Sequence, residues 1–209
     1  MLATWWCGVN EWNPKNDNTP RKWILHDGIG YIFPEAQKVY LSNQAQTGSW
    51  FKVNRQSDSP KEEISLDVFK LWLDHGAQPD NGNYQYIVVP STTEAEIEKS
   101  VHNIKILINT PDFQAVKHSG LNILQAIFYT SGEIQVSENL KIGMDSPGVV
   151  MIKTNGQAVK QISVADPSRQ LRRIHLTVTE KIEKSGENFR AFWNQAKGVS
   201  EIAIDLPQT

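Results

Sequence analysis

Apolar and polar residues along this chain of 209 residues follow the short alternations of β-strands far more often than the spacing of helices. In the first half, apolar runs separated by turn-rich pieces predict strands at 38–42, 48–53, 68–76 and 84–90. The run at 68–76 would also fit an amphipathic helix, but its β-branched and aromatic residues favour a strand. The pattern therefore predicts an all-β chain.

The stretch WILHDGIGYIFP, at 23–34, is the strongest local signal. Asp27-Gly28 between two apolar runs predicts a hairpin with a two-residue type I′ turn, because both turn residues need positive φ. This turn would pair His26 with Ile29 and Trp23 with Ile32. Both faces of the hairpin would then be largely apolar, which indicates a layered β structure. Pro34 is expected to end the second strand, since proline cannot donate to the ladder.

Residues 90–102, PSTTEAEIEKSVH, depart from the strand pattern. Ser91 with Glu94 fits a capping box, and Ile97 with Val101 forms an apolar i, i+4 pair, so a short helix is predicted. We place a domain boundary here, between a first domain at 1–98 and a second at 99–209.

Strand patterns then resume and continue to the end of the chain. The second domain is predicted to contain a further Asn-Gly hairpin turn at 154–157. Its expected strands are 104–109, 113–118, 122–130, 148–154, 158–166, 173–182 and 201–206.

Composition argues against several classes of protein. The net charge is −2, so no nucleic-acid partner is expected. The charge is uneven, with 8 Lys/Arg and 13 Asp/Glu in 1–98 against 13 and 10 in 99–209, and the mildly basic second half could meet an anionic partner or form a solvated surface. Cys7 is the only cysteine, which excludes a disulfide framework. No apolar run is long enough to span a membrane, and the N-terminus lacks the pattern of a signal peptide. A soluble chain without membrane contact is expected.

Two acidic-His pairs are candidates for acid–base chemistry. His26 beside Asp27 could form a dyad, but adjacent strand residues point to opposite faces, so the turn interpretation is favoured. Asp74-His75-Gly76 could place a general base at a strand end, although a tight turn through Gly76 is the preferred interpretation. The five histidines are scattered without ligand spacing, and no metal or cofactor is predicted.

Arginines and aromatic residues offer candidate binding sites. Arg169, Arg172, Arg173 and His175 could bind a sulfate or carboxylate group of a substrate, or could form a solvated loop after a turn at 166–168. Tyr84 and Tyr86 share one side of their predicted strand with Val88, which is more typical of a packed stripe than of a sugar platform. Tryptophans could stack on carbohydrate or fill a β core, and this group comprises Trp5, Trp6, Trp12 and Trp50.

Three long segments together resemble one known family. KWILHDGIGYIFPEAQKVYLSNQAQTGSWFKVN (22–54), VFKLWLDHGAQPDNGNYQYIVVP (68–90) and IKILINTPDFQAVKH (104–118) resemble the C-terminal half of polysaccharide lyase family 8, with weaker likeness to the end of the chain. The matching signatures occur in the family's order: Trp23, His26-Asp27-Gly28, Gly30-Tyr31, Phe33-Pro34, Gly48-Ser49-Trp50, Asp74-His75-Gly76, Tyr84, Tyr86 through Pro90, Asn109-Thr110-Pro111 and Gln114-Ala115-Val116.

The resemblance implies an architecture and an activity. It implies the later part of a β supersandwich, of the galactose mutarotase-like kind, in 1–98 and a small antiparallel C-terminal β-sandwich domain in 99–209. It also implies a parent enzyme, secreted or periplasmic, that cleaves acidic polysaccharides of the chondroitin or hyaluronan type by β-elimination.

The same resemblance limits what this chain can do alone. The family's catalytic residues come mostly from an N-terminal α/α toroid that nothing here matches, so no catalytic residue is assigned and the chain is expected to be inactive as a lyase. The alternatives are a stand-alone carbohydrate-binding or adhesin-like β-sandwich and a purely structural surface domain.

Overall fold

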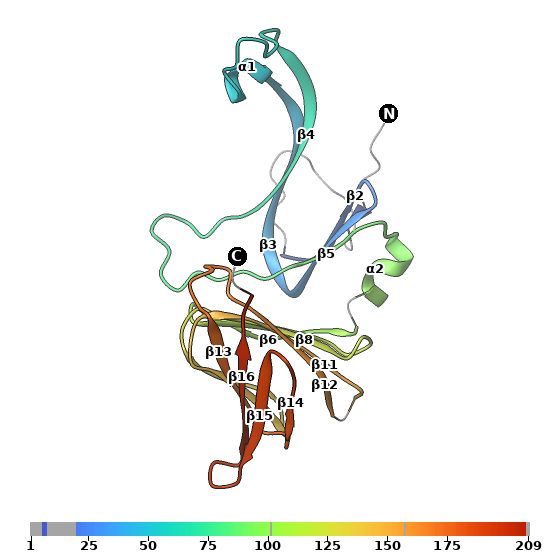
Figure 1. Cartoon of the computed structure of the whole chain (residues 1–209). Helices are drawn as coiled ribbons and strands as arrows, with labels where there is room; N and C mark the ends of the chain where they lie inside the picture. The colour runs from blue at the N-terminus through green and yellow to red at the C-terminus, as the bar shows by residue number, and fades with distance from the viewer. Residues whose placement is uncertain (1–5, 8–19, 101, 157, 208–209) are drawn as a thin grey trace. The chain divides into compact units, whose positions relative to one another are not determined.

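The computed structural model describes residues 6–7, 20–100, 102–156 and 158–207, which belong to two compact units. The first unit comprises residues 1–101 and the second comprises residues 102–209. Strands dominate both units, and the two helices of the described residues are short (Figure 1). The predicted all-β fold class is therefore confirmed.

The first unit contains one sheet of five strands in the order β1-β2-β3-β4, with β5 also pairing with β3. Its elements are β1 (Trp6–Cys7), β2 (Pro20–His26), β3 (Ile29–Gly48), α1 (Trp50–Val53), β4 (Ile64–Leu73), β5 (Ile87–Val89) and α2 (Glu94–Ser100).

The hairpin of β2 and β3 has the predicted turn and register. Asp27 and Gly28 have φ values of 48° and 73°, and His26 pairs with Ile29. Both faces of the hairpin are covered as expected. Ile24 and Phe33 are buried in one apolar cluster, while Trp23 and Ile32 belong to another.

The prediction that Pro34 ends the second strand is wrong. β3 continues through Pro34 to Gly48, and its register with β2 shifts between the pairs Trp23–Ile32 and Arg21–Gln37. Residues 33–36 therefore bulge out of the ladder at the proline. A bulge is one of the few places in a sheet where the missing N–H of proline costs no ladder hydrogen bond.

Beyond the bulge, β3 and β4 form a long two-stranded ribbon that carries α1 at its far end (Figure 1). The expected strand at 48–53 is therefore wrong, because β3 ends at Gly48 and the chain then turns through α1. The N–H of Phe51 donates to the carbonyl of Pro60, and Lys52 forms an ion pair with Glu63. These contacts hold α1 against the segment that leads into β4, which a pattern of apolar residues alone does not reveal.

Helix α2 exists as predicted but begins differently. Ser91 has a left-handed φ of 54°, and Thr93 precedes the first turn, with its hydroxyl donating to Glu96. The predicted capping pair of Ser91 and Glu94 is therefore displaced by two residues, because Ser91 turns the chain before the helix starts. Ile97 is fully buried, whereas Val101 lies outside the described residues.

The second unit is a sandwich of two antiparallel sheets. One sheet has the strand order β14-β15-β16-β13-β10-β9, and the other has the order β12-β11-β8-β7-β6. Their bounds are β6 (Ile104–Asn109), β7 (Phe113–His118), β8 (Ile123–Phe128), β9 (Gly132–Ser137), β10 (Leu140–Met144), β11 (Gly148–Thr154), β12 (Val159–Ala165), β13 (Arg173–Val178), β14 (Lys184–Ser185), β15 (Phe189–Asn194) and β16 (Val199–Asp205). Among these strands, β9, β10, β14 and β15 are not predicted from the sequence.

The predicted Asn-Gly turn joins β11 to β12, which pair as a hairpin. The side-chain oxygen of Asn155 accepts a hydrogen bond from the N–H of Ala158 at 2.8 Å, and Gly156 has a φ of 93°. The loop between the two strands spans 155–158, so it is longer than a two-residue turn. Gln157 lies outside the described residues.

Both sheets of the second unit contribute to one apolar core. Leu124 and Val150 come from the sheet that contains β8, and Leu176 and Ile202 come from the sheet that contains β13. All four side chains are buried, as expected when the inner faces of two sheets pack together. None of the helices in the described part of the chain has the length and apolar character needed to cross a membrane.

Candidate functional site

The outer face of the sheet of β13, β16 and β15 gathers charged side chains of both signs, with Arg173 and Arg190 beside Asp205. Ile174, Leu176 and Ile202 point into the core, so the residues that alternate with them lie on the outer face. His175 and Arg190 both pair with Ala203, which lies on the strand between them. The three strands thus place an imidazole and a guanidinium on either side of a methyl group.

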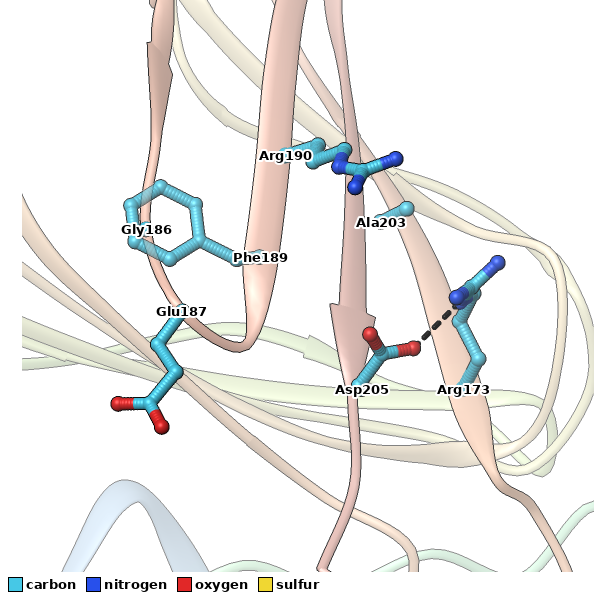
Figure 2. Close-up of a pocket in the computed structure, with 7 residues that line it drawn as sticks. All are labelled: Arg173, Gly186, Glu187, Phe189, Arg190, Ala203 and Asp205. Carbon is cyan, nitrogen blue, oxygen red and sulfur yellow. Dashed lines mark hydrogen bonds and ion pairs between the residues drawn. The ribbon is translucent and has the colours of Figure 1, made fainter.

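A pocket of about 120 Å³ lies beside Ala203 (Figure 2). We call it the Ala203 pocket, and its lining residues are Arg173, Gly186, Glu187, Phe189, Arg190, Ala203 and Asp205. The small side chain of Ala203 leaves room between the two arginines. The pocket therefore offers hydrogen-bond donors and charge on an exposed face, the kind of surface that suits a polar ligand.

One arginine of the pocket is paired and the other is not. The Nε–H of Arg173 donates to Oδ1 of Asp205 at 2.6 Å (Figure 2), and this hydrogen bond raises the pKa of Arg173 and lowers the pKa of Asp205. Arg190 forms no hydrogen bond or ion pair through its side chain with any residue that the structure describes, although its charge helps to lower the pKa of Asp205. The guanidinium of Arg190 is thus available to a ligand, whereas a ligand of Arg173 would have to compete with Asp205 for its guanidinium.

The four residues predicted as a substrate-binding group lie on two segments, β13 and the loop before it. Arg173 lines the Ala203 pocket, and His175 lies two residues further along β13 on the same face. Arg169 and Arg172 belong to the preceding loop. Arg169 has a left-handed φ of 57°, and the carbonyl of Arg172 accepts a hydrogen bond from the N–H of Leu206. Neither Arg169 nor Arg172 is among the residues that line the pocket.

Asp166 gives that loop a defined shape. Its carboxylate accepts hydrogen bonds from the Ser168 hydroxyl and from the backbone N–H groups of Ser168, Gln170 and Leu171, at 2.6 to 2.8 Å. These bonds, led by that from the Ser168 hydroxyl, lower the pKa of Asp166 to about 2. The loop is therefore an ordered turn closed by one carboxylate.

Arg190 is the residue that sequence reasoning missed. The stretch FRAFWN at 189–194 is not among the predicted strands, although Phe189, Ala191 and Trp193 alternate with Arg190 and Phe192. This period-2 pattern would have placed Arg190 on the outer face.

The structure supports the turn interpretation of Asp27. Asp27 is exposed in the hairpin turn, and the ring of His26 packs against that of Phe69 with 4.2 Å between ring centroids. Burial in this position lowers the pKa of His26, and the charge of Asp27 opposes the shift only in part. His26 therefore has a packing role, and its burial favours the neutral imidazole.

The second acidic-His pair is also part of a turn. Oδ1 of Asp74 accepts a hydrogen bond from the N–H of Gly76 at 2.8 Å, and Gly76 has a φ of 74°. The exposed ring of His75 lies 6.0 Å from the ring of Tyr84. The carboxylate of Asp74 orders the backbone here, in agreement with the preferred interpretation.

Tyr84 and Tyr86 are exposed, so the expectation of a packed stripe is wrong. Only Ile87–Val89 forms β5, and the tyrosines precede it without a paired neighbouring strand among the described residues. Their rings are stacked on each other with 6.2 Å between centroids and 20° between planes. Trp50 is exposed too, while the side chains of Trp5, Trp6 and Trp12 lie outside the described residues.

No group of three or more His, Cys, Asp or Glu side chains in the described part of the chain could hold a metal ion. The candidate chemistry of the second unit is therefore the charge and hydrogen-bonding capacity of the Ala203 pocket. In the first unit it is the exposed aromatic pair of Tyr84 and Tyr86.

Comparison with family models gives two consecutive matches. Residues 8–101 match the super-sandwich domain of polysaccharide lyase family 8, and residues 105–175 match the C-terminal β-sandwich domain of the same family. The order of the two matches along the chain is the order of the two structural units.

Curated relatives carry names of polysaccharide lyases. Chondroitinase-AC of Pedobacter heparinus is 41% identical over 89% of this chain, and a xanthan lyase of Bacillus sp. is 27% identical over 78%. A hyaluronate lyase of Thermasporomyces composti is 28% identical over 75% of this chain. The chain spans only 24%, 17% and 20% of these relatives, respectively.

Solved structures agree in fold. A chondroitinase AC lyase, solved in complexes with oligosaccharide, superimposes with a TM-score of 0.75 at 36% identity, covering 99% of this chain and 29% of the lyase chain. A Paenibacillus xanthan lyase gives a TM-score of 0.77 at 24% identity, covering 91% of this chain and 19% of the other, and this likeness supports the fold alone.

Proposed function

Because the chain belongs to polysaccharide lyase family 8, as its C-terminal part, we propose that it supports an enzyme that cleaves glycosaminoglycans containing uronic acid by β-elimination. The observation that carries this proposal is the 41% identity to chondroitinase-AC, together with the two family matches in order. Within this proposal, residues 1–98 belong to the central super-sandwich and residues 99–209 form the C-terminal domain. The expected substrate is a polysaccharide of the chondroitin or hyaluronan type.

The chemistry of β-elimination sets demands that this chain does not meet by itself. The reaction needs a group that neutralises the uronate carboxylate, a base for the proton alpha to it, and an acid for the leaving oxygen. His26 is packed against Phe69, and His75 lies beside a turn whose carboxylate is engaged with backbone. The chain is thus a structural support of the substrate cleft, and the catalytic groups belong to the α/α toroid that the resemblance implies. The parent enzyme would act outside the cytoplasm, where such polysaccharides occur.

The activity of the isolated chain provides the first test. We expect no unsaturated uronate product, followed by its ultraviolet absorbance, when the chain is incubated with chondroitin sulfate or hyaluronan. The matched positive control is Pedobacter heparinus chondroitinase-AC under the same conditions. Sustained turnover by the isolated chain would refute the assignment of a supporting role.

Direct contact with the polysaccharide is a separate part of the proposal. Arg173 and His175, with Arg190 across the Ala203 pocket, would meet sulfate or carboxylate groups, and Arg169 and Arg172 would extend this binding surface along the loop. Arginine suits this role because its planar guanidinium can bind an anionic oxygen pair with two parallel hydrogen bonds.

Calorimetric titration with chondroitin sulfate and hyaluronan oligosaccharides, at low and moderate salt, tests that contact. We expect saturable binding that weakens with salt and is lost in Arg190→Gln, because surface electrostatic attraction is screened. Arg55→Gln is the matched control, since Arg55 is an exposed arginine of the first unit. Absence of binding at both salt concentrations would make the chain a scaffold without its own glycan site.

A second candidate function is a stand-alone carbohydrate-binding protein. The observation that favours it is the exposed, stacked pair of Tyr84 and Tyr86, since aromatic rings on a surface can stack on sugars. The genomic context separates the two candidates. An upstream reading frame, in frame and encoding a helical toroid, supports the lyase, and its absence supports the stand-alone protein.

A further inference from the structure

Two Asn-Gly pairs occur in the chain, Asn81-Gly82 in the segment between β4 and β5 and Asn155-Gly156 in the hairpin of β11 and β12. Asparagine is one of the thermally labile residues of proteins. When glycine follows it, the backbone nitrogen of the glycine can reach the side-chain carbonyl carbon, because no side chain crowds the approach. The attack needs an asparagine side chain that is free to rotate and a glycine N–H that is not held in a hydrogen bond. The two pairs differ in both respects.

The Asn155-Gly156 pair is held at both reacting groups. Oδ1 of Asn155 accepts a hydrogen bond from the N–H of Ala158 at 2.8 Å, and the N–H of Gly156 donates to Oγ1 of Thr154 at 3.2 Å. The N–H of Asn155 in turn donates to the carbonyl of Ala158 at 3.1 Å. These bonds lie in the loop of a hairpin whose two strands are paired. The attack at Asn155 therefore requires at least two hydrogen bonds of the loop to break first.

The Asn81-Gly82 pair has neither restraint. Every residue from 76 to 84 is exposed, and this segment lies outside the described strands and helices. Neither the side chain of Asn81 nor the N–H of Gly82 forms a hydrogen bond with any residue that the structure describes. An exposed side chain without a partner changes rotamer rapidly, so the side chain of Asn81 can reach the orientation that the attack needs.

We propose that Asn81 deamidates spontaneously in the folded chain, to aspartate and isoaspartate, while the fold protects Asn155. The nitrogen of Gly82 gives up its proton and bonds to Cγ of Asn81, and the bond from Cγ to Nδ2 breaks, so ammonia leaves with that proton. Water then opens the resulting five-membered imide. Breakage of the new Cγ–N bond gives aspartate, and breakage of the original peptide bond gives isoaspartate. No electrons are transferred, and water is the only co-reactant.

The modification changes the structure of the loop as well as its charge. The Nδ1 atom of His75 and the Cβ atom of Pro79 each lie 3.4 Å from the position that a Cβ on Gly82 would occupy. The ring of His75 also lies 6.0 Å from that of Tyr84. Isoaspartate at position 81 adds one methylene group to the main chain, so Gly82 has to shift relative to His75. The inference rests on neither the proposed lyase function nor the Ala203 pocket.

Peptide mapping of the full chain measures the two rates in one experiment. The chain is incubated at mildly alkaline pH below its unfolding temperature, and samples are digested with trypsin and analysed by mass spectrometry. Cleavage after lysine puts Asn81 in peptide 71–99 and Asn155 in peptide 154–160. Fragmentation separates Asn81 from Asn83 within the first peptide. We expect Asn81 to deamidate at least tenfold faster than Asn155, and equal rates would overturn the proposal.

The same incubation in concentrated urea separates the effect of the fold from that of the sequence. Both pairs have the same two residues, so unfolding should bring the two rates within a few-fold of each other, mainly because Asn155 becomes faster. A tenfold difference that persists in urea would show that neighbouring residues, and not the hydrogen bonds of the hairpin, set the rates.

Thr154→Val removes the acceptor of the Gly156 N–H with little change in shape. We expect several-fold faster deamidation of Asn155 in this variant and an unchanged rate at Asn81. Gly82→Ala is the matched variant at the other pair, and it should slow the reaction of Asn81 several-fold by crowding the attack. An unchanged rate at Asn155 in Thr154→Val would refute protection by the hydrogen bond.

NMR of the His75 ring tests the consequence for the loop. The aged protein is compared with Asn81→Asp, which carries the new charge on an unaltered main chain. We expect the isoaspartate form to shift the His75 ring signals more than Asn81→Asp does. Equal shifts in the two proteins would mean that the added methylene group leaves the contact between His75 and Gly82 in place, contrary to the inference.

Discussion

The Cδ1 atom of Ile97 lies 2.7 Å from the position that a Cβ atom on Gly30 would occupy. Ile97, on α2, is fully buried and packs in one cluster with Trp23 and Ile32 of the hairpin. The methyl group of Thr92 lies 3.0 Å from the same position. The absent side chain of Gly30 is therefore what lets α2 rest directly on β3.

Gly30→Ala is expected to destabilise the first unit. The added methyl group would overlap Ile97 and Thr92, and overpacking of this kind costs roughly 1–3 kcal/mol. Urea unfolding followed by tryptophan fluorescence would measure the loss. Gly48→Ala is the matched control, because a Cβ at Gly48 meets nothing within 4 Å. Equal stability of the two variants would contradict the close packing of α2 on β3.

Gly28→Ala is expected to destabilise the same unit through the backbone alone. Gly28 has open space around its missing Cβ but a φ of 73°, and a left-handed conformation costs about 1–2 kcal/mol for a residue with a side chain. Asp27→Asn serves as the control, since asparagine tolerates the left-handed region as well as aspartate does. The same urea unfolding experiment applies, and a Gly28→Ala protein as stable as Asp27→Asn would exclude the type I′ turn.

These two glycines show where sequence reasoning succeeds and where it fails. The turn at Asp27-Gly28 and the pairing of Trp23 with Ile32 are predictable, because the turn chemistry is local and fixes the register. The bulge at Pro34 is not, because β3 continues into a second partner strand that only tertiary contacts provide. Nothing near Gly30 in the sequence indicates Ile97, which packs on it from a distant helix.

The candidate site is less predictable than the fold. Proximity in the sequence identifies Arg173 and His175, but the pocket is completed by Arg190 from a neighbouring strand. The same proximity adds Arg169 and Arg172, which are in the loop before β13 and are not among the lining residues. Side chains that meet across a sheet are distant along the chain, so spacing alone does not identify them.

Asp166 makes the stability of its loop depend on pH. The pKa of its carboxyl is about 2 in the folded chain against 3.8 as the ordinary value, so the folded state favours the ionised form. The stabilisation is therefore complete above pH about 4 and is lost as pH falls towards about 2. We expect NMR titration of the Asp166 carboxyl carbon to give a midpoint near the lower value.

A variant isolates that contribution. Asp166→Asn should lower stability at neutral pH and should flatten the fall in unfolding free energy between pH about 4 and about 2. Glu138→Gln is the control for removal of one negative charge, because Glu138 is exposed and its side chain forms no ion pair with any described residue. An Asp166 titration midpoint close to 3.8 would show that the hydrogen bonds do not form in solution.

Ser200→Ala is expected to destabilise the second unit. Ser200 is fully buried, and its hydroxyl donates to the carbonyl of Glu180 and accepts from the N–H of Ile182, both at 2.7 Å. Removing it leaves two backbone groups without this partner, at a cost of roughly 2–3 kcal/mol. Thermal unfolding followed by circular dichroism would measure the effect, with Ser137→Ala at an exposed position as the control. A change smaller than that of Ser137→Ala would mean that water replaces the hydroxyl.

The hydrogen bond from the N–H of Thr92 to the carbonyl of Gly28 has a consequence for the order of synthesis. A ribosome delivers the hairpin before β5 and α2, and its turn can form as soon as β2 and the start of β3 emerge. β5 and α2, which pair with and pack on that hairpin, emerge only after the ribbon of β3 and β4 has been made. The first unit therefore closes late, through contacts between distant parts of the chain, and we expect its nascent hairpin to stay accessible to chaperones until α2 has left the exit tunnel.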